Sequence, residues 1–127
     1  KQVNFSPWIS SSKIPNLLHN FDVVVLPSKT TKSWKEQFGR ILIEAMSSGI
    51  PVVGSDSGEI PHVIGDAGLI FKEGDIDDLK DSLMKLYSDP SLGQLLSDKG
   101  RQRVQENFTH AIVARDTVDL YRKIVNS

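Results

Sequence analysis

Residues 22–53 read DVVVLPSKTTKSWKEQFGRILIEAMSSGIPVV and place a strand, a polar loop, a helix and a second strand in succession. The unbroken apolar run at 23–26 is typical of a parallel strand that is buried on both faces. A helix is expected from about Gly39 to Ser48, with Gly49 ending it. The apolar residues at 51–53 predict the next strand. This order favours a parallel sheet whose strands are joined by crossover helices.

The alternation extends outward from this stretch. Short strands are predicted at 3–5 and 68–71, with helices at 11–21 and at about 58–64. From Asp75 onward the pattern is helical only, with Asp75 and Thr109 as expected N-caps and Pro90 in a first turn. We therefore predict an α/β fold, a Rossmann-like doubly wound parallel sheet of about four strands with a helical C-terminal segment. Residues 1–127 are expected to form a single domain.

Composition excludes several classes of function. The 127 residues carry a net charge of −1, which argues against a nucleic-acid partner. The sequence has no cysteine, and no residue cluster has metal-ligand spacing, so we expect no disulfide and no metal site. No apolar run approaches the roughly 18 residues of a transmembrane segment, and no signal peptide is evident. Because the chain begins with Lys1, we expect it to be a piece of a longer protein.

The candidate site lies where ligands bind in such sheets, beyond the carboxyl ends of the strands. Loops 28–39 and 55–61 should meet at that edge. A helix start offers unpaired amides and a partial positive charge, which suit a phosphate group. Gly39 would let the backbone approach a ligand, while Lys35 and Arg40 could add charge-assisted hydrogen bonds. These features predict a phosphate-binding turn at the start of the helix.

Two carboxylates flank this turn in the stretch EQFGRILIEAM, residues 36–46. Glu36 and Glu44 are acceptors that could hold sugar hydroxyls on either side of a diphosphate, as a nucleoside diphosphate sugar requires. The helical wheel also supports a simpler interpretation. Glu44 shares a polar arc with Arg40, four residues earlier, where an exposed ion pair would form on a solvated face. The residues alone leave both interpretations open.

Motifs in a fixed order carry a resemblance to a known family. The chain resembles the donor half of a retaining GT-B glycosyltransferase of the family-4 type, the glycosyl transferases group 1. The resemblance covers nearly the whole chain and continues through GDIDDLKDSLMKLYSDP, RQRVQENFT and LYRKI. Its central motifs are Pro27-Ser28, Glu36, Phe38-Gly39, Glu44-Ala45-Met46, Gly49, Pro51-Val52-Val53, Gly58 and Pro61.

The resemblance implies roles for these residues. Glu36 would be the catalytic-site residue that contacts hydroxyls of the transferred sugar, and Glu44 would bond the ribose hydroxyls. Backbone amides at 38–40 would meet the diphosphate of the nucleoside diphosphate sugar. Transfer would proceed with retention, without a metal or another cofactor. The implied substrate-binding residues are Glu36, Gln37, Phe38, Gly39, Arg40 and Glu44.

The chain departs from the family pattern in several ways. Arg40 stands at a position that is usually aliphatic, and His62 stands where glutamate is common. Ser57 replaces a glycine and is expected to cap the following helix. The acceptor domain and the first strands of the donor domain are missing, so the chain resembles an incomplete GT-B donor domain. We therefore expect no turnover by these 127 residues alone.

The expected partners are a nucleoside diphosphate sugar and, through the missing N-terminal domain, an acceptor sugar or lipid. The resemblance implies work in the cytoplasm, at the inner membrane face, without a transmembrane segment. Two other functions remain as alternatives. One is a non-catalytic interaction or regulatory module with a doubly wound fold. The other is a different GT-B sugar-nucleotide enzyme, such as an epimerase.

Overall fold

The computed structural model describes residues 2–127 and contains a parallel sheet with helices on both faces. The strands are β1 (Val24–Leu26), β2 (Val52–Ser55) and β3 (Leu69–Phe71), in the order β1-β2-β3. Both strand pairs are parallel, which confirms the predicted α/β class. The helices are η1 (Ser11–Lys13), α1 (Ile14–Leu18), α2 (Arg40–Ser47), α3 (Ile60–Ile64), α4 (Ile76–Ser88), α5 (Pro90–Asn107) and α6 (His110–Val125).

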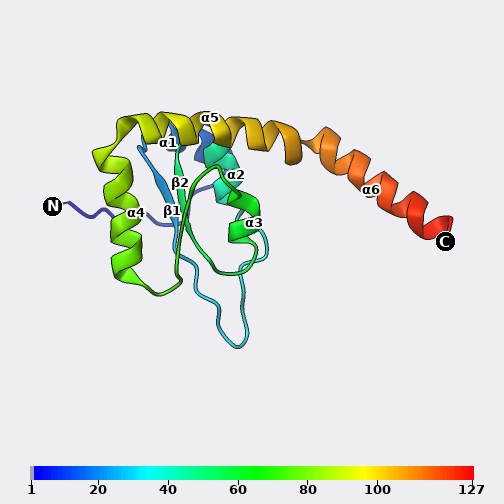
Figure 1. Ribbon diagram of the computed structural model, residues 1–127, viewed down its shortest axis with the longest axis horizontal. Coiled ribbons are helices and arrows are strands. Elements are labelled where there is room, and N and C mark those ends of the chain that lie inside the picture. Colours follow the sequence, from blue (N-terminus) through cyan, green and yellow to red (C-terminus); the bar gives the residue numbers. More distant parts are fainter. Residues whose placement is uncertain (1) are drawn as a thin grey trace.

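Figure 1 shows how these elements are layered. Helix α4 lies on one side of the strands, and α2 and α3 lie on the other. The loop between β1 and α2 extends past the carboxyl ends of the strands, while α5 runs across the opposite end of the sheet (Figure 1). The loop that carries Glu36 therefore lies at the edge where the sequence predicts a ligand site.

Two strand predictions were wrong in detail. The sheet has three strands rather than about four, because residues 3–5 form no strand, and both Val3 and Phe5 are exposed. A short extended segment is not stable as a strand without a neighbour to pair with it. The run at 23–26 was expected to be buried on both faces, yet β1 is only half-buried because it lies at the edge of the sheet. The central strand β2 is the one that is buried throughout.

The core forms between the sheet and α2. Leu42, Ala45 and Met46 are the buried residues of α2, and their spacing of three and four residues places them on one face of the helix. They belong to one cluster with Val52 and Ile60. Burying a valine, leucine, isoleucine or methionine side chain stabilises the fold by about 1.5–3 kcal/mol. This packing fixes α2, and therefore its first turn, relative to the strands.

Helix α5 holds the other end of α2. The Ser97 hydroxyl donates to the carbonyl oxygen of Gly49 at 2.6 Å. A Cβ at Gly100 would lie 3.1 Å from Cγ and 3.2 Å from Cβ of Met46, so a larger residue there would require Met46 to shift by a few tenths of an ångström. The contact anchors α2 at the end remote from the candidate site.

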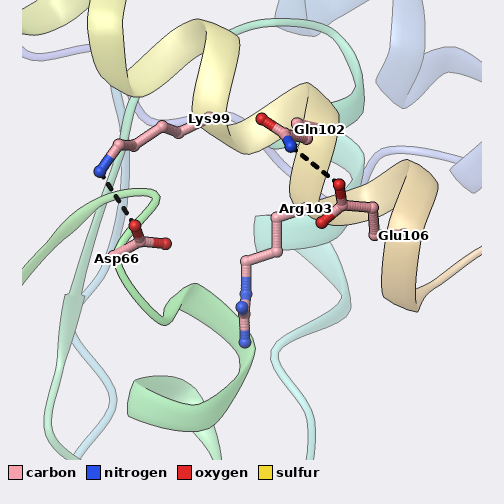
Figure 2. A pocket seen from close by; sticks show the side chains of 5 residues that line it. All are labelled: Asp66, Lys99, Gln102, Arg103 and Glu106. Atoms are coloured by element: carbon pink, nitrogen blue, oxygen red, sulfur yellow. Dashed lines mark hydrogen bonds and ion pairs between the residues drawn. The ribbon is translucent and has the colours of Figure 1, made fainter.

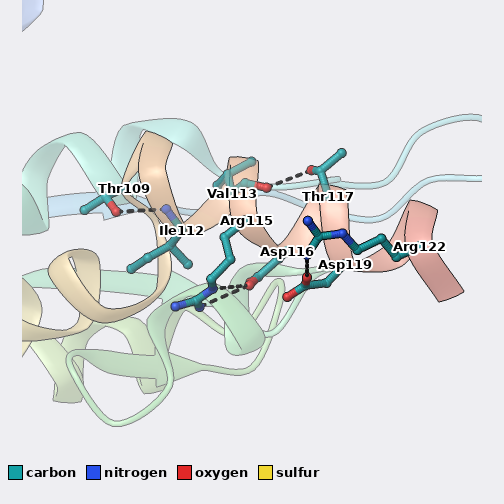
Figure 3. Close-up of polar contacts among 8 residues, drawn as sticks. All are labelled: Thr109, Ile112, Val113, Arg115, Asp116, Thr117, Asp119 and Arg122. Carbon is teal, nitrogen blue, oxygen red and sulfur yellow. Dashed lines mark hydrogen bonds and ion pairs between the residues drawn. The ribbon is translucent and has the colours of Figure 1, made fainter.

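The C-terminal helices begin at the predicted caps. Asp75 accepts a hydrogen bond from the Asp78 amide at 3.0 Å, and Thr109 accepts one from the Ile112 amide at 3.3 Å. Helix α6 continues beyond α5 and extends away from the rest of the chain (Figure 1). Its polar contacts are internal, as in the ion pair between Arg115 and Asp116 (Figure 3). Within residues 2–127, no helix combines the length and apolar character that crossing a membrane requires.

Candidate functional site

The turn into α2 depends on a glycine. Gly39 is the N-cap of α2, with φ of 70° and ψ of 51°. Residues that carry a side chain rarely adopt this left-handed backbone conformation. A Cβ at this position would also lie 3.1 Å from both Leu26 Cδ2 and Leu42 Cδ1. The close approach that Gly39 permits is thus to the end of β1 and to the first turn of α2. It turns the chain sharply from the loop into the helix.

Glu36 folds back onto this turn. Its Oε1 accepts hydrogen bonds from the amides of Gly39 at 3.0 Å and Phe38 at 3.4 Å. Its Oε2 accepts a hydrogen bond from the Ser28 hydroxyl at 3.2 Å. The half-buried carboxylate therefore has a fixed orientation beside the positive end of the helix. A negatively charged group does occupy the helix start, and the chain itself supplies it.

This arrangement refines the expected phosphate-binding turn. The amides of Phe38 and Gly39 are bonded to the Glu36 carboxylate instead of being open to a ligand. The amides of Arg40 and Ile41, in the first turn of α2, donate to no acceptor among residues 2–127. Unpaired amides at a helix start are the groups that bind anions. The open part of the turn therefore begins at residue 40, two residues later than the sequence suggests.

Glu44 lies one turn deeper along α2 and pairs with Arg40. The Arg40 Nε is 3.2 Å from Glu44 Oε1, and the side chains are 81% and 27% exposed, respectively. The ion pair foreseen for a solvated face is thus present. An exposed pair of this kind contributes little to stability, about 0.3–0.5 kcal/mol. Both groups carry open hydrogen-bonding capacity close to the helix start.

On its other side, the turn packs against the C-terminal end of α5. The ring of Phe38 packs edge-on against Phe108, with centroids 6.0 Å apart and ring planes at 78°. The Arg103 guanidinium lies 5.8 Å from the centroid of the same Phe108 ring. Gln37, by contrast, is exposed. Sequence reasoning missed Phe108, because a contact between residues so far apart in sequence leaves no local signal.

The loop after β2 supports the loop that carries Glu36. The Ser55 hydroxyl donates to the carbonyl oxygen of Ser28 at 2.6 Å, and the Thr30 and Ser57 hydroxyls share a hydrogen bond of 2.8 Å. The prediction that Ser57 caps the next helix was wrong. Glu59 is the N-cap of α3, and the buried Ser57 side chain instead bonds across to the neighbouring loop.

A polar hollow of about 200 Å³ lies on a different part of the surface, lined by Asp66, Lys99, Gln102, Arg103 and Glu106 (Figure 2). Its groups are already paired. Lys99 lies 2.9 Å from Asp66 and, by hydrogen bonding and charge, holds the pKa of Asp66 below its ordinary value. Gln102 donates to Glu106 at 2.8 Å. Of these two contacts, Gln102 to Glu106 lies within α5, and Lys99 to Asp66 joins α5 to the segment after α3.

Arg103 connects α5 to α3. Its guanidinium donates to the carbonyl oxygens of Val63 at 2.7 Å and His62 at 2.5 Å, at the end of α3. The side chain of His62 is exposed, as expected for a surface residue. Among residues 2–127, no group of three or more His, Asp or Glu side chains is arranged to hold a metal ion.

Comparison with known proteins decides the family. A family model described as glycosyl transferases group 1 matches residues 1–103. The chain belongs to this family. It is 33% identical over 126 residues to MMP alpha-(1->4)-mannosyltransferase of Mycolicibacterium hassiacum, covering 97% of this chain and 29% of that protein. It is 31% identical over 114 residues to N-acetyl-alpha-D-glucosaminyl L-malate synthase of Bacillus anthracis, covering 88% and 29%.

Solved structures share the fold of this chain. Sucrose-phosphate synthase from Thermosynechococcus elongatus superposes with a TM-score of 0.81 at 28% identity, over 97% of this chain and 30% of that one. Anabaena HepE, solved in complex with UDP, superposes with a TM-score of 0.78 at 20% identity, over 88% and 30%. These likenesses confirm the expected fold. The chain spans about three-tenths of the length of the relatives it matches.

Proposed function

We propose that this chain is the donor-binding part of a longer retaining glycosyltransferase. The enzyme would move a sugar from a nucleoside diphosphate sugar to a polysaccharide, lipid or small glycoside acceptor. The observation that carries the proposal is the Glu36 carboxylate, bonded to the Gly39 amide at 3.0 Å beside the open first turn of α2. An oriented acceptor and unpaired amides at a helix start are thus adjacent, and these groups suit the two halves of such a donor.

The diphosphate would bind at the first turn of α2. The amides of Arg40 and Ile41 lack an acceptor within residues 2–127, and the helix dipole favours negative charge there. The exposed Arg40 guanidinium could add a charge-assisted hydrogen bond to a phosphate oxygen. During transfer the leaving diphosphate gains charge. Dipoles and cations that are already fixed in place stabilise that charge without reorganising.

Glu36 would hold the sugar that is transferred. Its carboxylate already accepts hydrogen bonds from Ser28, Phe38 and Gly39, so it cannot rotate freely. A carboxylate has about four lone-pair sites, which leaves acceptor capacity for a sugar hydroxyl. Accepting such hydroxyls would orient the anomeric carbon relative to the diphosphate. This contact is what makes Glu36 the proposed catalytic residue.

Glu44 would hold the ribose on the other side of the diphosphate. Its carboxylate is partly exposed and engages Arg40 through Oε1 only. Two adjacent ribose hydroxyls are donors that such a group can accept. In the donor complex, Arg40 would turn toward the phosphates and release Glu44 to the ribose. The ion pair would then be the resting arrangement of both residues.

The relatives support sugar transfer without fixing its details. Their names include a mannosyltransferase and a sucrose-phosphate synthase, and HepE was solved with UDP. Because these proteins differ in product, we leave the donor sugar, the base and the acceptor open. The acceptor would bind to the part of the longer enzyme outside these residues. By the family resemblance, we expect that enzyme to work in the cytoplasm at the inner membrane face.

The test is a calorimetric titration of the longer enzyme against UDP-, GDP- and ADP-sugars, in wild type and in Glu44→Ala. The proposal expects one nucleotide family to bind and the variant to bind it more weakly. Equal binding of that nucleotide sugar by both proteins would remove Glu44 from the site. Binding of none of the panel would overturn the proposed function.

A further inference from the structure

The backbone of Gly58 lies directly against the backbone of Glu36. Gly58 has φ of +57°, and a Cβ there would overlap the carbonyl oxygen of Glu36 and lie 2.9 Å from its carbonyl carbon. The Glu59 amide donates to the same carbonyl oxygen at 3.2 Å. Because the obstacle is main chain, no side-chain rotation could relieve such an overlap. A side chain at residue 58 would force one of the two loops to move.

Hydroxyl contacts join the same two loops. Ser57 is 1% exposed, and its hydroxyl meets that of Thr30 at 2.8 Å. The Ser55 hydroxyl, on a residue that is 0% exposed, donates to the Ser28 carbonyl at 2.6 Å. Ser28 in turn donates its own hydroxyl to Glu36. The segment 55–59 therefore contacts the Glu36 loop at three residues, Ser28, Thr30 and Glu36.

We propose that Gly58 is a positioning residue for Glu36, and that its bare backbone sets where the Glu36 carboxylate lies at the start of α2. The positioning of Glu36 does not depend on the proposed function, but the expected effect of Gly58 on donor binding rests on it. The carboxylate reaches the Gly39 amide at 3.0 Å, so a main-chain shift of about 1 Å at Glu36 would break this hydrogen bond. Gly58 touches no proposed donor atom and acts through Glu36 alone.

The test is Gly58→Ala in the longer enzyme, with Gly74→Ala as the matched control. Gly74 also has a positive φ, of +78°, but a Cβ there would meet only the Lys29 side chain, 3.8 Å away. The control therefore also places a side chain at a positive φ, but without the overlap. A crystal structure of Gly58→Ala should show Glu36 displaced and its hydrogen bond to Gly39 lost. An unchanged Glu36–Gly39 bond would overturn the proposal.

Affinities give the functional readout. Gly58→Ala should lower affinity for the nucleoside diphosphate sugar about tenfold and leave affinity for the bare nucleoside diphosphate nearly unchanged. Combined with Glu36→Ala, it should add no further loss, because both changes remove the same contact. Additive losses would overturn the positioning role. If Glu36→Ala alone had no effect while the crystal structure showed the displacement, the proposed function would fail and the positioning would stand.

A milder variant covers the case in which Gly58→Ala does not fold. Thr30→Val with Ser57→Ala removes one of the three hydrogen bonds between the loops and leaves neither hydroxyl of that pair without a partner. It should lower nucleotide-sugar affinity in the same direction and to a smaller extent. Wild-type affinity in this folded double variant would contradict the positioning of Glu36 by segment 55–59.

Discussion

The carboxylate of Glu36 accepts a hydrogen bond from the amide of Gly39, 3.0 Å away and three residues further along the chain. A carboxylate at a helix start is stabilised by the unpaired amides and by the helix dipole. The left-handed conformation of Gly39 then turns the chain into α2. The relationship explains why a glutamate lies three residues before this glycine: Glu36 supplies the charge and Gly39 supplies the turn.

Glu36→Gln tests whether donor binding needs the negative charge of residue 36 or only the shape of its side chain. The amide keeps one acceptor oxygen for the Gly39 amide, so the fold should persist. Affinity for the nucleoside diphosphate sugar should fall by about 1–3 kcal/mol, because hydrogen bonds to a charged group are lost. Calorimetry with the sugar nucleotide and with the bare nucleotide checks this. A loss of equal size for both ligands would argue that Glu36 does not contact the sugar.

Glu44→Ala distinguishes the two interpretations of that residue. If Glu44 bonds ribose, the variant should weaken nucleotide-sugar binding by about 1–3 kcal/mol. If it serves only an exposed ion pair with Arg40, unfolding free energy should change by about 0.3–0.5 kcal/mol and affinity should stay the same. We expect the first outcome. Donor titrations and chemical denaturation of the same samples measure both quantities.

Asp89 gives a prediction about stability and pH. It caps α5, accepting from the Ser91 hydroxyl and from the Ser91 and Leu92 amides. The Ser91 hydroxyl and the Leu92 amide hold the pKa of Asp89 below its ordinary value of 3.8. A lowered pKa stabilises the folded state above pH 3.8, and this contribution is lost as the pH falls through the folded-state pKa.

Asp89→Ala should therefore lower the melting temperature near neutral pH, and its difference from wild type should shrink as the solution is acidified below pH 3.8. Asp89→Asn is the matched control, because asparagine also caps helices well but does not ionise. Thermal unfolding at a series of pH values is the measurement. A gap between wild type and Asp89→Ala that stays constant down to strongly acidic pH would contradict the account.

The isolated 127-residue chain is expected to transfer no sugar. It spans about 29% of the relatives that it matches, and we propose that the acceptor binds to the remainder of the longer enzyme. Product formation from radiolabelled UDP-, GDP- and ADP-sugars, with the longer enzyme as positive control, would measure this. Detectable transfer by the chain alone would show that the acceptor site is already present within it.

The sequence predicted α2 well because the periodicity of residues 41–46 reports directly which side is buried. It predicted β1 less well. An apolar run shows that a strand prefers burial, but whether both faces are covered depends on neighbouring strands, and β1 lies at the sheet edge. Residues 3–5 failed for a related reason, since strand formation needs a partner that sequence cannot identify.

The sequence predicted which residues surround the turn better than it predicted the contacts between them. Glycine before a helix and a nearby glutamate point to the turn, but the bond from Gly39 to Glu36 depends on how the whole loop bends. The contact between Gly58 and Glu36 joins two loops through backbone atoms. Apart from the glycine itself, no residue type in the sequence indicates such a backbone contact. Ser57 was misassigned because serine suits a helix cap as well as a bond between loops.

The most direct test of the donor site is a crystal structure of the longer enzyme with its nucleoside diphosphate sugar bound. We predict phosphate oxygens within hydrogen-bonding distance, about 3 Å, of the Arg40 and Ile41 amides, with the transferred sugar against Glu36 and the ribose against Glu44. A donor bound anywhere else, with the Arg40–Glu44 ion pair intact and the first turn of α2 empty, would contradict the account.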